Sequence, residues 1–151
     1  METDLKIKPS ETASDKYLIT NNCVERLLEE WDKYGKLIVA YDFDNTVYES
    51  NGDCSQVIEL LRACKDLGCY MIVFTCRPAE EYHIVEEFLQ SNDIPYDIIN
   101  ENCPDTNFKT SRKIFYNIFL DDRCGLRSAY ETLVQTIDRR LHKDGDDIGV
   151  L

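Results

Sequence analysis

Hydrophobic positions along this chain form two kinds of pattern, one with helical spacing and one that is nearly continuous. From residue 21 or 22 to residue 34, apolar side chains recur at helical spacing, and Gly35 follows as a natural helix stop. Residues 37–41 then form an almost uninterrupted apolar run. Such a run is typical of a strand that is buried on both faces of a sheet.

Three more helices and three more strands are expected from the same patterns. The helices cover about residues 55–67, 78–90 and 126–141, and the strands cover residues 69–75, 96–99 and 114–120. Ser55 is a suitable N-terminal cap for the first of these helices, and Ile84 belongs to the inward face of the second. This alternation predicts an α/β fold, a three-layer αβα Rossmann-like parallel sheet covered by helices on both faces.

A chain of 151 residues fits a single domain. We assign residues 20–142 to that domain, preceded by a flexible N-terminal lead-in (1–19) and followed by an acidic tail (143–151). No apolar run reaches the roughly 18 residues that a membrane span needs, and the polar N-terminus lacks the apolar stretch of a secretory signal. We therefore expect a cytoplasmic protein with no membrane partner.

The net charge of −12 and the seven cysteines limit the kinds of partner. An acidic surface repels phosphate backbones, which disfavours binding to long nucleic acid. The cysteines include no C-x-x-C pair and are accompanied by only two histidines, so a structural zinc site has little support. We expect reduced thiols that pack as small hydrophobes, with Cys64, Cys69 and Cys76 in buried segments.

Carboxylates follow the first and the last of the expected strands. Asp42 and Asp44 come after residues 37–41, and Asp121 and Asp122 come after residues 114–120. The carboxyl ends of parallel strands meet at one edge of the sheet, so these acids should converge there. Their mutual repulsion favours a hard cation between them, and ligation by oxygen alone favours Mg²⁺. Such a site can attack phosphorus through one carboxylate, while a second carboxyl group transfers the proton.

These residues resemble the signatures of the haloacid dehalogenase-like (HAD) superfamily. Residues 42–46 read Asp-Phe-Asp-Asn-Thr and match its first signature, D-x-D-x-[TV], after an apolar strand. Thr75 at a strand end is similar to the second signature, and the pair Asp121 and Asp122 is similar to the acidic fourth. The match covers about residues 36–125. Further stretches resemble small uncharacterised hydrolases of this superfamily, including phage-associated ones.

The resemblance implies a role for each matching position. Asp42 would be the nucleophile and a metal ligand, and Asp44 would be the acid/base and would bind Mg²⁺ through its backbone carbonyl. Thr75 would donate a hydrogen bond to the phosphoryl group. Asp121 and Asp122, one or both, would complete the metal shell. The implied activity is Mg²⁺-dependent hydrolysis of a phosphomonoester such as a nucleotide, a sugar phosphate or another small phosphorylated metabolite.

Two lysines are candidates for the positively charged side chain that stabilises the phosphoryl group. Lys113 has the resemblance in its favour, but it stands well before Asp121 and would lie near the far end of a strand that began near residue 115. Lys109 in the preceding loop is the rival. Arg77 is a candidate for a bidentate phosphate contact, or else an exposed arginine at a helix start.

Connections near the expected site are too short for a cap domain. Residues 47–54 suffice for a flap, and residues 100–112 are also too few for a domain. We therefore expect a minimal cap or none, and an open site that acts on bulky phosphorylated groups or takes a lid from another subunit of a homo-oligomer.

Three other functions are alternatives to this hydrolase. A phosphorelay receiver would need a lone aspartate on a middle strand, where this chain has Thr75. A polynucleotide 3′-phosphatase stays open, because Arg77 and Arg123 follow the signatures as they do in such domains. A catalytically silent binding protein on the same fold also stays open. Two findings would contradict a metal centre: separation of Asp42 from Asp121 and Asp122, or an ion-paired arginine that fills the pocket.

Overall fold

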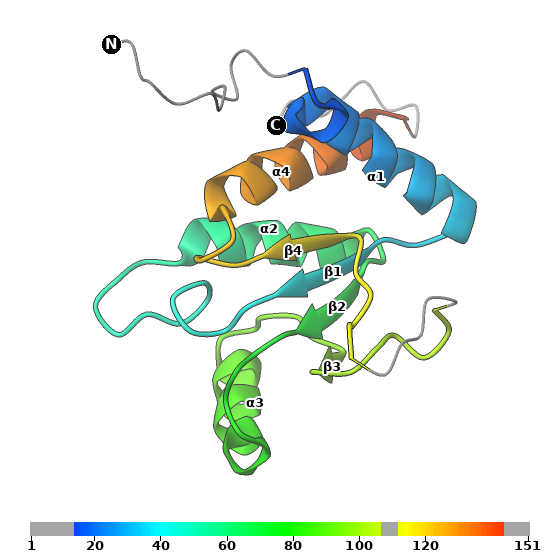
Figure 1. The fold of residues 1–151 in the computed structure, drawn as a ribbon. Helices are drawn as coiled ribbons and strands as arrows, with labels where there is room; N and C mark the ends of the chain where they lie inside the picture. Colours follow the sequence, from blue (N-terminus) through cyan, green and yellow to red (C-terminus); the bar gives the residue numbers. More distant parts are fainter. Residues whose placement is uncertain (1–13, 107–111, 144–151) are drawn as a thin grey trace.

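In the computed structural model, residues 14–106 and 112–143 are described. Over these residues helices and strands alternate along the chain (Figure 1). The helices are α1 (Thr20–Tyr34), α2 (Ser55–Asp66), α3 (Tyr82–Ser91) and α4 (Leu126–Lys143), with 3₁₀ turns η2 (Lys16–Leu18) before α1 and η3 (Ala79–Glu81) before α3. The strands are β1 (Ile38–Tyr41), β2 (Tyr70–Val73), β3 (Ile98–Ile99) and β4 (Ile118–Leu120).

The four strands form one parallel sheet in the order β3-β2-β1-β4. In the registered pairs, Tyr41 at the end of β1 lies opposite Val73 of β2 and Leu120 of β4. The carboxyl ends of the three strands are therefore aligned at one edge. The predicted parallel sheet of a Rossmann-like α/β fold is confirmed.

The helices of the described residues place their buried side chains on one face of this sheet. Residues from all four join a single apolar cluster with Val39 and Tyr41 of β1. Ile38 and Ala40 alternate with these and point to the other face, where they pack with Cys103 and with residues 114–116. The prediction of helices on both faces, and hence of three layers, is wrong for the described part of the chain.

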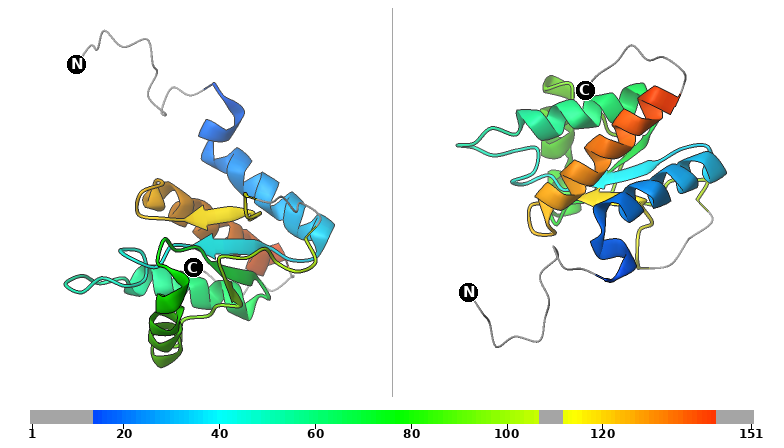
Figure 2. Two further views of the ribbon diagram at one scale, coloured as in Figure 1. Left: turned by 60° about the horizontal axis from the view of Figure 1, so that its bottom comes forward. Right: turned by 90° about the horizontal axis from the view of Figure 1, so that it is seen from above.

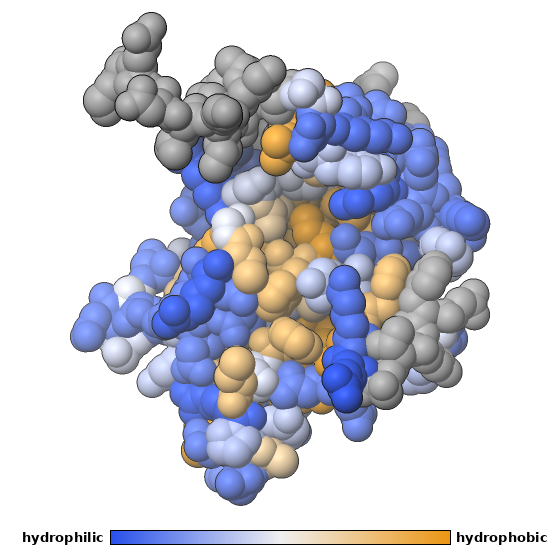
Figure 3. All heavy atoms as spheres, in the orientation of Figure 1, coloured by the Kyte–Doolittle hydropathy of each residue, from blue (hydrophilic) through white to orange (hydrophobic). Residues whose placement is uncertain are grey.

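The reason lies in the connection between β3 and β4. Right-handed crossovers from β1 to β2 and from β2 to β3 place α2 and α3 on the same face. Cover for the other face would have to come from the next connection, whose described residues (100–106 and 112–117) form no helix. Figure 3 shows apolar side chains gathered over the strands on the face it views.

The first and last helices, α1 and α4, pack side by side (Figures 1 and 2). Trp31 of α1 is 2% exposed, and the Arg140 guanidinium of α4 stacks 4.7 Å from its ring centre. The Asp32 carboxylate accepts hydrogen bonds from Arg140 (2.6 Å) and Lys143 (2.7 Å). These bonds lower the pKa of Asp32, with that from Lys143 the larger cause.

Local details differ from the predictions at several element ends. Gly35 ends α1 with a left-handed φ of 79°, as its position suggested. Ser55 does not cap α2, because the Asp53 carboxylate accepts the Ser55 N–H bond (2.8 Å) instead. Ile84 is 43% exposed rather than inward. Each strand is shorter than its apolar run. Some flanking residues, such as Leu37 and Phe74, still make backbone hydrogen bonds to the neighbouring strand, whereas others, such as Cys69, only pack.

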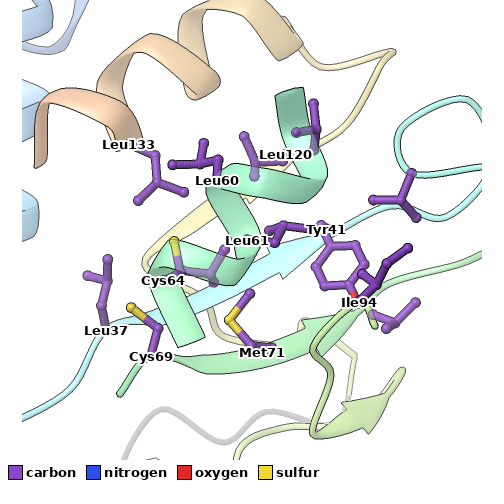
Figure 4. Close-up of a cluster of buried hydrophobic side chains, with 14 of the residues drawn as sticks. Leu37, Tyr41, Leu60, Leu61, Cys64, Cys69, Met71, Ile94, Leu120 and Leu133 are labelled. Atoms are coloured by element: carbon purple, nitrogen blue, oxygen red, sulfur yellow. The ribbon is translucent and has the colours of Figure 1, made fainter. Parts of the chain in front are cut away.

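All seven cysteine side chains are free. Cys64 and Cys69 are buried side by side in the core (Figure 4), and hydrogen bonding between them, together with burial, raises the pKa of Cys64. Cys76 is exposed, contrary to the prediction, because β2 ends at Val73 and Cys76 lies in the turn beyond it.

None of the described helices combines the length and the apolar character that a membrane span requires.

Candidate metal centre and active site

Asp42 begins the site because it is the first residue after β1. Its backbone N–H donates to the Leu120 carbonyl of β4 (2.9 Å), so the sheet pairing continues to this residue. The backbone then turns sharply through Asn45, whose φ is 65°, and a bridge between Asp44 and Tyr48 closes the turn. Beyond it, the loop to α2 projects from the carboxyl edge of the sheet (Figures 1 and 2).

Asp42, Asp121 and Asp122 form a carboxylate triad. One oxygen of each lies within 4.8 Å of the oxygens of the other two. Asp42 and Asp121 are partly buried and Asp122 is exposed, so the triad faces solvent at the end of β1 and β4. The structure thus brings together three of the four acids that follow the two expected strands, and the Asp44 carboxylate is not one of them.

Thr46 links two members of the triad, Asp42 and Asp122. Its hydroxyl group lies 3.4 Å from an Asp42 oxygen and 3.3 Å from an Asp122 oxygen, and it accepts the Asp122 N–H bond (3.1 Å). The residue is 1% exposed. Thr46 belongs to the first signature, but no site role was predicted for it. The threonine at the fifth position of that signature was the available signal.

The three carboxylates of the triad repel one another. Burial, followed by a hydrogen bond with Asp122 and repulsion from Asp121 and Asp122, raises the pKa of Asp42 to about 7. Among the described residues, no ion pair with lysine, arginine or histidine reaches any of the three acids.

This donor set fits a hard divalent cation. Three carboxylates close together offer only oxygen ligands, which suit Mg²⁺ better than softer metals. The raised pKa of Asp42 also indicates where a positive charge would be most stabilising. The Asp44 carboxylate does not belong to this triad, so any contribution of Asp44 to a metal would come through its backbone carbonyl, as the resemblance implies.

Asp44 forms a two-pronged ion pair with Arg77. The Arg77 Nη2 and Nε atoms donate to the two Asp44 oxygens at 2.7 and 3.0 Å. The guanidinium also lies 5.2 Å from the Phe43 ring centre, and its Nη1 reaches Glu81 at 3.4 Å. The bond to Asp44 is the largest cause that raises the pKa of Arg77. Arg77, which was predicted to bind phosphate, is therefore paired with Asp44. It makes no ion pair with the three acids of the triad.

Thr75 closes β2 at the same edge of the sheet. It is 8% exposed, and Asn100 holds its backbone through two hydrogen bonds of 2.8 Å, one to its N–H and one to its carbonyl. Its hydroxyl group accepts the Arg77 N–H bond (3.2 Å) and keeps its own hydrogen for another acceptor. Asn100, which has a φ of 55°, directly follows β3, and its position at a strand end pointed to this edge of the sheet without indicating its role.

The structure does not bring Lys113 to the triad. Asn117 donates its N–H to Ile38 at the amino end of β1, the opposite end from Asp42. Lys113 is exposed and lies on the approach to that end. Lys109 lies outside the described residues.

Comparisons with known proteins bear on the fold. No family model matches the chain, and no curated protein is similar to it. A solved structure, that of a conserved protein coded by a locus of Bacteroides thetaiotaomicron, is similar with a TM-score of 0.56. The two sequences are 18% identical, and the match covers 74% of this chain and 99% of the other. At this identity the likeness supports the α/β fold alone.

Proposed function

We propose that this chain is a Mg²⁺-dependent phosphomonoester hydrolase of the HAD-like type, with Asp42 as the nucleophile. The observation that carries the proposal is the triad of Asp42, Asp121 and Asp122, which is open to solvent and has no paired cation among the described residues. Mg²⁺ bound there would neutralise charge between the nucleophile and the phosphate and would orient both.

The reaction has two steps in which atoms and protons balance. In the first, an Asp42 oxygen bonds to phosphorus as the ester P–O bond breaks, and the leaving oxygen takes a proton from Asp44. In the second, the oxygen of a water molecule bonds to phosphorus as the bond between phosphorus and the Asp42 oxygen breaks, and Asp44 takes a proton from that water. The products are inorganic phosphate and free Asp42. Thr75 would donate its hydroxyl hydrogen to a phosphoryl oxygen.

Arg77 must move for Asp44 to take part. Both Asp44 oxygens accept hydrogen bonds from Arg77, so neither faces a leaving group while this ion pair is in place. A phosphate dianion offers Arg77 an acceptor pair of matching geometry. In this proposal Arg77 turns from Asp44 to the bound phosphoryl group, which releases Asp44 for proton transfer and keeps Arg77 in the phosphate-binding role.

A catalytically silent Mg²⁺-binding protein is the second candidate. The ion pair between Asp44 and Arg77 favours it, because a permanent pair would leave the metal centre without a proton donor. The two candidates share the triad and differ in whether Asp42 ever carries a phosphoryl group.

The first test measures hydrolysis of 4-nitrophenyl phosphate with Mg²⁺ and with EDTA. Mg²⁺-dependent turnover that Asp42→Asn abolishes, and that the exposed loop variant Asp53→Asn retains, supports the hydrolase. Hydroxylamine quenching followed by peptide mass spectrometry should locate a hydroxamate at Asp42. Full turnover by Asp42→Asn would refute the nucleophile. Mg²⁺ binding without turnover or hydroxamate would favour the silent protein.

A further inference from the structure

An aromatic side chain stands next to the nucleophile on the open face of the sheet. The Phe74 N–H donates to the Tyr41 carbonyl (2.8 Å), while the Asp42 N–H donates to Leu120. Pairing therefore continues one residue beyond the strands and places Phe74 and Asp121 on either side of Asp42. Alternation along each strand assigns these three positions to the face of Ala40, which the described helices do not cover.

The small side chain of Ala40 lets two aromatic rings meet across β1. Phe119, which is registered opposite Ala40, lies edge-to-face with Phe74 at a ring-centre distance of 5.4 Å. Tyr116 extends the group, 5.2 Å from Phe119. We call Phe74, Phe119 and Tyr116 the aromatic platform. It begins beside the carboxylate triad and runs away from it over the strands.

Solvent reaches this platform at the end nearest the triad. Phe74 is 37% exposed, whereas Phe119 is partly buried against the Ile38–Ala40 side of the sheet. If Phe74 and Phe119 served only to fill the core, the Phe74 ring would not need to be exposed beside the carboxylates. Figure 3 shows apolar side chains over the strands on this face, and the sheet pairing places Phe74 next to Asp42 at the carboxyl end of the strands.

We propose that the aromatic platform is the binding subsite for the leaving group of the substrate, and that this group carries a planar ring, as in a nucleoside monophosphate. The proposal rests on the proposed phosphohydrolase function. A phosphate at the triad places its leaving group next to Phe74. A neutral nucleobase can stack on an exposed ring without the repulsion that this acidic chain imposes on a polyanion.

The test compares two phosphomonoesters that differ in the leaving group. Adenosine 5′-monophosphate has a planar base, and glycerol 2-phosphate has none. Wild-type protein should favour the nucleotide. Phe74→Ala should lower kcat/KM for the nucleotide about fivefold or more, fivefold being the lower end of the effect expected for loss of one stacking ring, and change it less than twofold for glycerol 2-phosphate. Phe74→Trp should retain the preference.

The control variant is Ile84→Ala, which truncates another exposed apolar residue outside the platform. It should leave both esters unaffected, and circular dichroism should show each variant folded. An equal loss on both esters with Phe74→Ala, or no loss on either, would overturn the subsite while leaving the hydrolase intact. A change of oligomeric state in Phe74→Ala, seen by sedimentation without a change in selectivity, would instead identify the face as a contact between copies and also overturn it.

A binding measurement separates failure of the subsite from failure of the enzyme. Saturation-transfer NMR with adenosine, which has no phosphate, reports on the platform alone. If neither ester is hydrolysed, the phosphohydrolase proposal fails, and transfer that is lost in Phe74→Ala but kept in Ile84→Ala would still support the subsite. Absence of transfer to the wild-type protein would overturn it.

Discussion

The carboxyl group of Asp42 destabilises the metal-free fold when it ionises. Its pKa is raised from 3.8 to about 7, so the folded state holds this proton more tightly than the unfolded chain does. The free energy of unfolding therefore falls as pH rises from about 4 to about 7, and stays lower above that range. Asparagine at this position carries no charge and avoids the loss.

We accordingly expect Asp42→Asn to be more stable than the wild type in EDTA at pH 8. Solvent screening of this partly exposed carboxyl group reduces the loss to about 1 kcal/mol. The gain should therefore be about 3 °C in melting temperature for a chain of this size, and it should shrink toward zero near pH 4. Melting followed by circular dichroism measures it. Asp53→Asn is the control of opposite sign, because the Ser55 N–H lowers the pKa of Asp53. A pH-independent gain in Asp42→Asn would contradict the assigned cause.

Mg²⁺ should reverse the order of melting temperatures of the wild type and Asp42→Asn. A ligand that binds only the folded state stabilises it by mass action. The wild type should therefore melt at a higher temperature as Mg²⁺ is added at pH 8, and Asp42→Asn, which lacks one anionic ligand, should respond much less. Equal responses in the two proteins would remove Asp42 from the metal centre.

Arg77 offers a test of geometry at constant charge. Lysine in its place keeps one positive charge but cannot make two parallel hydrogen bonds to Asp44 or to phosphate. We expect Arg77→Lys to lower kcat/KM for 4-nitrophenyl phosphate about tenfold, the order of one lost charge-assisted bond. Arg62→Lys alters an arginine that pairs with Glu59 instead and should have little effect. Wild-type activity in Arg77→Lys would exclude a bidentate role.

At the scale of elements, helices could be predicted better than strands. Helical periodicity located α1, α2 and α4 within a few residues, because one buried stripe determines each of them. Apolar runs overestimated every strand, because apolar residues beside the strands, such as Cys69 and residues 114–116, are apolar for packing rather than for sheet pairing. Periodicity also could not foresee that η3 would precede α3 and leave Ile84 outside.

The end of α1 gives a direct test of backbone conformation. Gly35 has a φ of 79°, and a Cβ atom added to it would meet nothing within 4 Å. Gly35→Ala should therefore lose stability through strain alone, by about 1 kcal/mol, and Gly35→Asn should lose less because asparagine tolerates this region. Urea denaturation measures both. Equal losses in the two variants would show that the cost has another origin.

At the scale of the molecule, convergence of the triad could be predicted because it depends only on parallel strands that end at one edge. The partner of Asp44 could not, since the path of the turn after β2 determines where Arg77 lies. The number of layers could not be predicted from the sequence either. The alternation of helices and strands does not reveal that the connection from β3 to β4 covers one face without a helix among its described residues.

Placement of the helices on one face makes α1 and α4 a shared support for the sheet and the site. Trp31 fills the contact between them, and α4 begins at Leu126, shortly after the acids of the triad. Trp31→Ala should lower the free energy of unfolding by about 3–5 kcal/mol, as for other buried tryptophans, and Glu29→Ala on the exposed side of α1 by less than about 0.5 kcal/mol. Urea denaturation followed by circular dichroism should show one cooperative transition in each. A separate early transition in Trp31→Ala would mean that α1 melts alone, and that the sheet and its carboxylates do not depend on it.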